Sequence, residues 1–560
     1  MIMKKFIIII LSIAFIPILN SCSDFDKLNV SPNDVNEVDP NFLLTTNTVN
    51  LASTYSGLGY WNSRIPSLLQ YYQVGDGYKS EELNALYWTP GQSSPWGGIY
   101  SNLVDVQAMS DLSIEQGNVF TEAVALVYRA ALMDLVTKIY GDAPFSETNQ
   151  LEEGIVFPKY DQQKEIYETL LMDLKTAKNM IEGISGNDVP VLDGYDLLYN
   201  GDKSKWIKFI NSLRIRMCLL LNNKKGELSI DIDAEFQDAA QNVFTSSDDN
   251  AVLDYIGNSS ATSFQGGPFR SSELTYARRM GLGFLNSLKD QNDPRLYRWL
   301  RPVEKKWDRD IAAETTIQYT DPLGQTFPVE VLPYPNGYDN LDTSLYVGLP
   351  VGSQASWTSY NAGPQATSVE PKTTPFNSRL SDIYFQNANE YVGMNIITYS
   401  EVEFILAEAA AIGAFGVSGA EAHYKNAIEA SMGEWGIFGD YVGGFDFDDY
   451  YSQEEVDLSQ ASNKHERIMT QKYISMFFRP EPWFDWRRTG YPDFVPPYDA
   501  AQPAIPLRYH YDSPNPPDPQ YVEKYNEAVE RLEKSEFVQV PTNDDTRSKM
   551  WLLQGTNVPY

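Results

Sequence analysis

The stretch Arg467–Phe494, RIMTQKYISMFFRPEPWFDWRRTGYPDF, places eight aromatic residues and five arginines or lysines within 28 positions. In its first half, long and apolar side chains recur every three to four residues, which predicts a helix that ends at Arg479-Pro480. The second half, Trp483–Gly490, holds too many large rings to lie free in water. We expect its arginines to stack on rings and to pair with buried carboxylates, as in a core segment. The alternative is a direct ligand platform.

The rest of the chain is acidic and rich in rings. Its 560 residues include 43 basic and 75 acidic side chains, a net charge of −32, and 13% are aromatic, with 36 Tyr and 11 Trp. A surface of this charge repels phosphate backbones, which argues against a nucleic-acid partner. Tyr and Trp combine a flat apolar face with a polar handle, which suits polar seams in a core and also carbohydrate or peptide platforms.

The N-terminus is typical of an exported lipoprotein. Residues 1–21 carry two lysines and then an apolar run, Phe6–Leu19, which is too short for a comfortable membrane-spanning helix. Cys22 follows at once, so we expect cleavage before it and acylation of its thiol; an ordinary secretory signal with an incidental cysteine is the alternative. Residues 22–40, rich in Asn, Asp and Pro, predict a tether. With Cys22 acylated, Cys218 has no disulfide partner and is expected to be buried.

Six amphipathic segments predict helices in three consecutive pairs. Apolar residues at a spacing of three to four line one face of each, and alanines stand at close-contact positions. Such pairs are typical of tetratricopeptide-type repeats, although unrelated helix hairpins would show the same pattern. The pairs are Val119–Ile139 with Tyr160–Ile181, Lys203–Asn222 with Asp233–Phe244, and Thr398–Ile412 with Gly419–Trp435.

Two loop-rich segments interrupt the helices. Tyr71–Tyr100 has many glycines and rings and no strong period. Asp248–Asn395 is rich in Gly, Pro, Ser and Thr, with isolated rings along it. Loops of this length are usually functional or disordered, and the aromatic content predicts order. Near the C-terminus one further helix is predicted at about Tyr521–Glu533.

Motifs for catalysis, metals or cofactors are weak throughout. The three histidines, His423, His465 and His510, lack metal-ligand spacing and are expected to be surface or structural. No phosphate-binding glycine loop is present. The acidic run Asp446–Tyr451 fails as a calcium loop, because Tyr451 stands where glycine is required, so we expect a solvated acidic loop. We therefore predict no catalytic residue, no metal and no cofactor. With 75 acidic residues, however, the spacing of carboxylates alone does not distinguish a glycoside hydrolase.

Five motifs in order along the chain carry a family resemblance. They are Cys22 with Leu28–Asn33, Tyr140–Ser146, Leu198–Trp206 with Asn211–Arg216, Glu401–Ala409, and Arg467–Pro492. With these motifs the chain resembles the SusD/RagB family of nutrient-binding outer-membrane lipoproteins of Bacteroidetes, in particular its SusD-like branch. Arg479-Pro480-Glu481-Pro482 departs from the family pattern, and its two prolines predict a stiff turn.

The resemblance implies a mostly α-helical SusD-like domain over residues 41–560, in which four tetratricopeptide-like hairpins carry a loop-rich half that includes the insertion at about 248–395. It also implies a surface protein, anchored by lipid in the outer membrane, that binds an oligosaccharide and delivers it to a SusC-like TonB-dependent transporter without catalysis. RagB-like members bind peptides instead. A surface glycoside hydrolase and a purely structural repeat scaffold are the alternatives from other classes.

The family's ligand contacts vary between members, so site residues have to come from the chain itself. Rings on rigid loops stack on sugar faces, while neighbouring Asn, Asp and Gln side chains bond the hydroxyls. The alternative for each ring is that it is simply packed. The rings expected to contact ligand are Trp88, Trp96, Tyr338, Trp357 and Tyr360. Function is thus expected on the loops, and Arg467–Phe494 is expected to be a signature of the fold.

Overall fold

The structure is a computed structural model that describes residues 39–556, except 61–63, 75–79, 84, 92–93, 152, 187–188, 271–277, 352–358, 367–373, 498–503 and 513–516. The predicted signal peptide, the lipidated Cys22, the tether up to residue 38 and Trp357 lie outside the described residues. Helices make up most of the regular structure and the strands are few and short, so the fold is mostly α as predicted. None of the described helices is long and apolar enough to cross a membrane.

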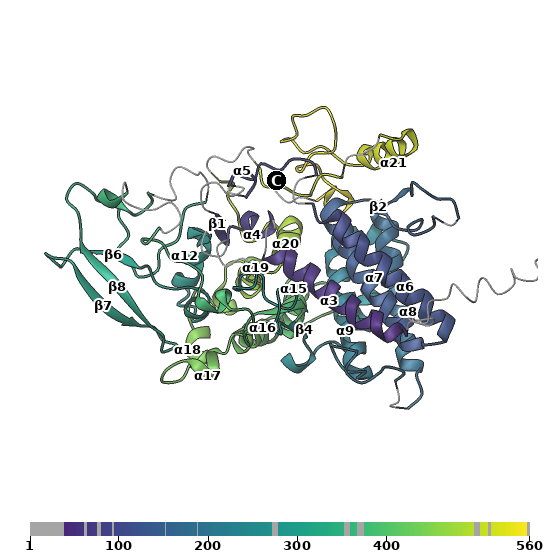
Figure 1. The fold of residues 1–560 in the computed structure, drawn as a ribbon, viewed down its shortest axis with the longest axis horizontal. Coiled ribbons are helices and arrows are strands. Elements are labelled where there is room, and N and C mark those ends of the chain that lie inside the picture. Colours follow the sequence, from purple (N-terminus) through teal and green to yellow (C-terminus); the bar gives the residue numbers. More distant parts are fainter. Residues whose placement is uncertain are drawn as a thin grey trace, which may run out of the picture.

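One half of the molecule is a stack of antiparallel helices (Figure 1). Neighbours in sequence pack on one another through the whole series, and the first helix lies across the next two. The first two predicted helix pairs are thereby confirmed. The helices are α3 (Pro40–Gly59), α6 (Trp96–Gln116), α7 (Val119–Tyr140), α8 (Gln163–Gly183), α9 (Lys203–Leu220) and α10 (Ile232–Ala240).

Local sequence explains where these helices begin. Asn118 accepts a hydrogen bond from the Thr121 amide at the start of α7, and Asp202 accepts from the first amides of α9. Such caps satisfy amide groups that have no partner within the helix. Asp231 caps α10 in the same way. The apolar stripe of α8 is fully buried, whereas α7 is buried on nearly every side because α3, α6 and α8 surround it.

Helix α6 is missing from the sequence expectation, which treats the segment up to Tyr100 as a loop. The helix begins at Trp96 after Pro95, and Gly97 and Gly98 in its first turn give a poor helical signal. Its buried residues Ile99, Leu103, Val106 and Met109 nevertheless recur every three to four positions. The apolar stripe of α6 begins only after these glycines, so the start of the helix has no helical pattern in the sequence.

The third predicted pair is confirmed as α15 (Tyr399–Ala411) and α16 (Ala420–Glu434), and α19 (Lys464–Ser475) packs on both. Helix α19 is the predicted first half of the opening stretch. The second half is also a helix, α20 (Glu481–Thr489). The expected turn at the two prolines is short, because it ends at Pro480 and the helix begins at Glu481, and its stiffness stays a prediction. Pro480 caps α20 and Pro482 stands in its first turn, where no intrahelical amide is lost.

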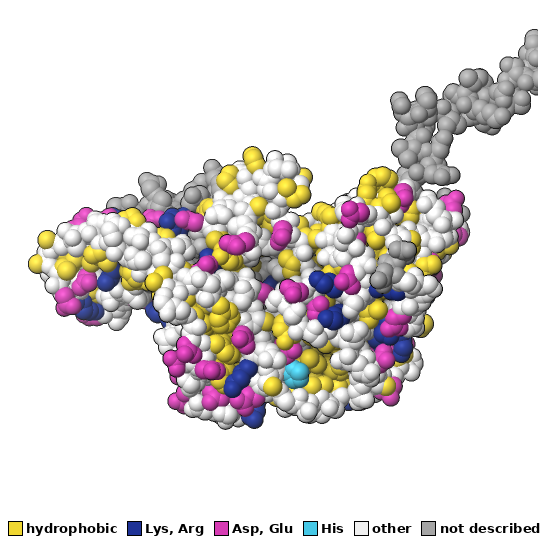
Figure 2. Space-filling model, turned by 90° about the horizontal axis from the view of Figure 1, so that it is seen from below, with side chains coloured by type: hydrophobic (Ala, Val, Ile, Leu, Met, Phe, Trp, Pro, Cys, Tyr) yellow, Lys and Arg dark blue, Asp and Glu magenta, His cyan; other side chains and the backbone are white. Residues whose placement is uncertain are grey.

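The insertion is closed at its base by a two-stranded antiparallel sheet of β4 (Ala251–Asp254) and β9 (Gly393–Ile397), which packs on α3. Within it lie α12 (Leu282–Asp290), α13 (Arg295–Trp299) and β5 (Arg278–Met280), which pairs with β1 (Tyr72–Val74). A three-stranded sheet follows, with β8 (Thr326–Pro333) between β6 (Lys305–Asp308) and β7 (Thr315–Thr320). This sheet extends from the body at the left of Figures 1 and 2.

The acidic run also differs from its expectation. Asp446 caps a short helix, α18 (Phe447–Tyr451), by accepting from the Asp449 amide. Tyr450 and Tyr451 are buried, so the run is not a solvated loop; its rings turn inward and its carboxylates outward. Near it lies α17 (Ile437–Asp440), and the predicted C-terminal helix is α21 (Pro519–Glu530).

Candidate ligand-binding site

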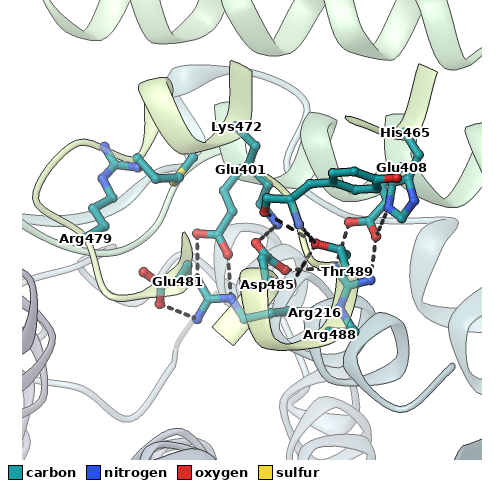
Figure 3. A network of polar contacts seen from close by, with 12 residues as sticks. Arg216, Glu401, Glu408, His465, Lys472, Arg479, Glu481, Asp485, Arg488 and Thr489 are labelled. Atoms are coloured by element: carbon teal, nitrogen blue, oxygen red, sulfur yellow. Dashed lines mark hydrogen bonds and ion pairs between the residues drawn. The ribbon is translucent and has the colours of Figure 1, made fainter. Parts of the chain in front are cut away.

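The opening stretch is core, as its composition predicts. Trp483 and Arg487 are buried, and the Arg487 guanidinium lies 4.2 Å from the centre of the Trp483 ring. Arg488 donates to both carboxylate oxygens of Glu408, with 2.8 Å between Nη2 and Oε2 (Figure 3). The stacked guanidinium group of Arg487 and the paired Arg488 are thus enclosed, and the Trp483–Arg488 cluster is part of the core.

The same network joins three parts of the chain (Figure 3). Arg216 on α9 makes two hydrogen bonds to Glu401 on α15, at 2.7 and 2.8 Å. Glu481 on α20 lies 3.9 Å from the Arg216 guanidinium without a hydrogen bond to it. Burial raises the pKa of Glu481 to about 7, and the negative charge of Glu401 adds to the shift. The network therefore fixes how the helices meet.

Two of the predicted ligand rings lie at the seam with the C-terminal segment. Trp88 is 6% exposed, and its ring lies 4.8 Å from both the Arg64 guanidinium and the Tyr509 ring. Trp96 is half-buried with its ring 4.8 Å from Tyr140. It also contacts Tyr100, Tyr160 and Tyr511. Both positions match the packed alternative more closely than an open platform.

Tyr338 and Tyr360 lie on two neighbouring loops of the insertion. Tyr338 is 40% exposed and Tyr360 is half-buried. The loops are tied together by Asn361, whose side-chain oxygen accepts from the Asp342 amide at 2.7 Å and whose amide donates to the Asp342 carbonyl at 3.0 Å. Burial, together with the charge of Asp342, raises the pKa of Tyr360. The structure thus brings these two rings into one region, away from Trp88 and Trp96.

A small cluster beneath these loops holds them in place. Trp307 and Phe376 stack with ring centres 5.0 Å apart, and the Trp307 indole donates to the Asn361 carbonyl at 2.7 Å. With Leu332 and Ala362 they form a satellite core that is separate from the main one. The loops that carry Tyr338 and Tyr360 therefore rest on a rigid base.

Tyr334 is a further ring of this region that the sequence reading does not select. The Arg309 guanidinium lies 3.6 Å from its ring centre, and its hydroxyl accepts from the Leu341 amide at 2.9 Å. Its only sequence signal is its place between two prolines near Tyr338. Together with Tyr338 and Tyr360 it makes the candidate site: rings for stacking, with amide and carboxylate groups for hydrogen bonds.

A cavity of about 240 Å³ lies in the helical half, between α6, α7, α8 and the loop after α7. Its two most prominent charged groups are already partnered. Arg129 donates twice to Asp173, and Asp161 accepts from the amides of Phe145 and Ser146. Phe145 and Ser146 belong to one of the five motifs, but no pattern in the sequence predicts a cavity beside them. We treat it as a feature of the scaffold.

The three histidines all contact acceptors of the protein, as their structural interpretation predicts. His423 Nδ1 lies 2.7 Å from Glu403, and His465 Nε2 lies 3.0 Å from Glu408. Nδ1 of His510 lies 3.0 Å from the Asp544 carbonyl, and burial lowers the pKa of this imidazole. Among the described residues no three His, Cys, Asp or Glu side chains gather in a way that could hold a metal ion. Cys218 is buried.

Solved structures of several proteins share this fold. A SusD homologue from Bacteroides fragilis superposes with a TM-score of 0.69 at 22% identity, over 92% of this chain and 99% of that one. An outer-membrane protein from Bacteroides vulgatus, linked by its description to nutrient binding, gives 0.69 at 23% identity over 92% and 100%. A chitin-binding protein gives 0.67 at 23% identity over 92% and 99%. No curated protein sequence matches the chain.

The sequence itself decides the family. Residues 32–512 match the profile of a family described as SusD-like, starch-binding and associating with the outer membrane. The match takes in the helix pairs, the insertion and the stretch Arg467–Phe494, and the fold agrees with it over nearly the whole chain. The chain therefore belongs to the SusD-like family of nutrient-binding, outer-membrane-associated proteins.

Proposed function

We propose that this protein captures an oligosaccharide at the cell surface and delivers it to a SusC-like TonB-dependent transporter, without catalysis. Membership of a family described as starch-binding is the observation that carries the proposal. The exposed rings on braced loops of the insertion support it, and so does the chitin binding that names one structural neighbour. Cys22 anchors the protein by lipid in the outer membrane under the same proposal.

The proposed contact surface is Tyr338 and Tyr360 with the Arg309–Tyr334 pair beside them. A pyranose ring stacks its C–H face on a tyrosine, and its hydroxyls bond the carboxylate and amide groups of the two loops. Because Trp307 and Asn361 already fix these loops, binding orders little further chain, and less conformational entropy is lost. Trp357 remains part of the prediction.

Calorimetry against maltohexaose, chitohexaose and a panel of peptides tests the ligand class. We expect binding to one of the glycans and none to the peptides, and a Tyr338→Ala/Tyr360→Ala variant should lose at least tenfold in affinity. Phe42→Ala is the matched control, because Phe42 is 50% exposed but lies on α3 in the helical half. Unchanged glycan affinity in the tyrosine variant would refute the site assignment.

Peptide capture, as in RagB-like relatives, remains the second candidate, favoured by the half-buried carboxylate of Asp342 near Tyr360, a group that pairs with cationic peptide side chains. Peptide binding with no glycan binding in the same panel would establish it. Product analysis on the bound glycans separates capture from hydrolysis: any turnover that disappears when one carboxylate is replaced makes the protein a glycoside hydrolase.

The transporter partnership has its own test. Affinity purification of the tagged lipoprotein from detergent-solubilised outer membrane should recover a large TonB-dependent β-barrel protein. A Cys22→Ala variant, which cannot be acylated there, should be released from the membrane fraction while still binding the glycan. Recovery of the wild-type protein alone would count against the partnership but leave glycan capture standing.

A further inference from the structure

A groove of about 640 Å³ opens where α16 faces the segment from α17 to α18. These three helices lie together near the lower edge of Figure 1. The groove contains the acidic run that the family resemblance does not use. It is lined by Lys425, Asn426, Glu429, Phe438, Gly443, Gly444, Phe445, Asp446, Phe447 and Asp448.

One wall is a row of rings rooted in the core. Phe438 is 41% exposed, and its ring centre lies 6.0 Å from that of Phe445. Phe445 in turn lies 6.0 Å from Tyr450, which is buried and donates to Asp293 at 3.1 Å. The exposed ring is thus the outer end of a packed row. A ring held in this way loses little freedom when a ligand stacks on it.

The other groups in the groove are polar and largely uncommitted. Within the part of the chain that the structure describes, the carboxylates of Glu429 and Asp448 make no hydrogen bond or ion pair. Asn426 donates only one bond, to Glu403 at 3.4 Å, and its side-chain oxygen accepts none there. These groups are available to a ligand without breaking an existing contact.

Two glycines leave bare backbone along the groove. Gly443 and Gly444 have φ of +88° and +87°, and a Cβ at either would meet nothing within 4 Å. Free space shows that packing does not require glycine there, whereas the backbone conformation does. A flat ligand can therefore approach the main chain closely at this point.

The charge of the groove limits the ligand class. Lys425 is its one cation, and it is already placed over the Tyr451 ring at 4.1 Å. Three carboxylates, of Glu429, Asp446 and Asp448, outweigh it. Sulfated or uronic-acid sugars would be repelled, while neutral hydroxyls can donate to the carboxylates.

We propose that this groove is a second glycan site, which binds a short stretch of a neutral oligosaccharide. A pyranose stacks on Phe438, and its hydroxyls donate to Glu429 and Asp448. The inference rests on the proposed function but names a different place. The β7–β8 turn touches Val442 beside the groove, whereas Tyr338 follows the other end of β8, roughly 25 Å away along that strand.

Saturation-transfer NMR and calorimetry on the full-length protein test the proposal in a Tyr338→Ala/Tyr360→Ala background, where the groove is the remaining site. Maltohexaose and chitohexaose are the neutral probes, and a hexamer of galacturonic acid is the anionic one. We expect residual binding of a neutral probe, a further tenfold loss with Phe438→Ala or Glu429→Gln, and no binding of the acid. Phe269→Ala, which removes a ring that is 52% exposed on the insertion, should change nothing.

The outcomes separate the two proposals. If the wild-type protein binds a neutral probe and the tyrosine variant has lost all binding, the groove is refuted and the proposed function stands. Residual binding that Phe438→Ala and Glu429→Gln leave unchanged refutes the groove as well. If neither neutral probe binds the wild-type protein, both the groove and capture of these glycans are refuted.

Discussion

The opening stretch and the satellite core of the insertion are built from the same residue types and behave differently. Both place guanidinium groups on rings: Arg487 over Trp483 in α20, and Arg309 over Tyr334 in the insertion. In α20 the cations also meet buried carboxylates, and helices close over them (Figure 3). In the insertion the rings stand over a base of four buried residues, and Tyr338 remains exposed.

The two regions have similar composition and differ in whether other parts of the chain cover them. Coverage therefore decides whether such a cluster belongs to the core or is open to a ligand. A ring–arginine cluster surrounded by paired carboxylates is fixed and has no open face. The ring–arginine pair on the small separate core also rests on buried rings, but it leaves Tyr338 in water. A ligand platform needs rings that are held in place and still accessible to solvent, because such rings are preorganised for binding. Acidic side chains are scattered over the face seen in Figure 2, and the net charge of −32 repels anions.

The largest expected effect comes from breaking the enclosed cluster. Arg488→Ala breaks a buried ion pair and leaves Glu408 with His465 as its remaining partner among the described residues, and removing one partner of such a pair costs about 3–5 kcal/mol of unfolding free energy. Urea denaturation monitored by circular dichroism measures it. Lys225→Ala is the control, because its exposed pair with Asp233 contributes about 0–1 kcal/mol. Equal losses of unfolding free energy in the two variants would show that the Arg488–Glu408 pair contributes no more than an exposed ion pair.

The same logic applies to Trp486, which is 5% exposed and packs against Phe494. Trp486→Ala should cost about 3–5 kcal/mol of stability and affect glycan affinity only through the fraction of folded protein. Thermal unfolding and calorimetry on the same sample decide. A Trp486→Ala protein of wild-type stability that had lost only its affinity would return the opening stretch to the candidate sites.

The satellite core should fail locally. Trp307→Ala removes one of two stacked rings and the bond to Asn361, a loss of about 3 kcal/mol that we expect to be confined to β6, β8 and the loops of Tyr338 and Tyr360. Hydrogen exchange should rise there and not in α7, and glycan affinity should fall. Trp299→Ala, in the main core, is the matched comparison. Equal deprotection of α7 in both variants would contradict the separation of the two cores.

How much of the fold the sequence predicts depends on how far apart in the chain the interacting residues lie. The helices at Val119–Tyr140 and Lys203–Leu220 follow from local stripes and caps, so the sequence predicts them closely. The β6–β8–β7 sheet joins strands in parallel and antiparallel pairs, and β7 is exposed on nearly every residue, so no local pattern indicates it. Glycines at its start conceal α6.

The site was predictable only in part for the same reason. Trp88 and Tyr338 both stand in ring-rich loops, and nothing beside them in sequence separates them. Trp88 is covered by Tyr509, which comes from the other end of the chain, whereas among the described residues no such segment covers Tyr338. The groove beside α16 likewise depends on two glycines and a row of rings that converge only in three dimensions.

The smallest expected effect is a pH dependence inside the enclosed cluster. Burial raises the pKa of Glu481 to about 7, above its value in the unfolded chain. A raised folded-state pKa favours the folded protein below the unfolded value of about 4.3, and this contribution is lost as the pH rises through about 7. Glu481→Gln, which cannot ionise, should therefore gain about 1–2 kcal/mol of stability on the wild type between pH 5 and pH 6.

Urea denaturation of both proteins at the two pH values measures this difference. Glu434→Gln serves as the control, because Glu434 accepts a hydrogen bond from Arg479 at 2.8 Å and its loss should destabilise at both pH values. A Glu481→Gln variant that is less stable than the wild type at pH 6 would mean that the ionised carboxylate is held by Arg216. Glu481 would then belong with the paired carboxylates that enclose the cluster, instead of being a buried carboxyl group whose ionisation the fold disfavours.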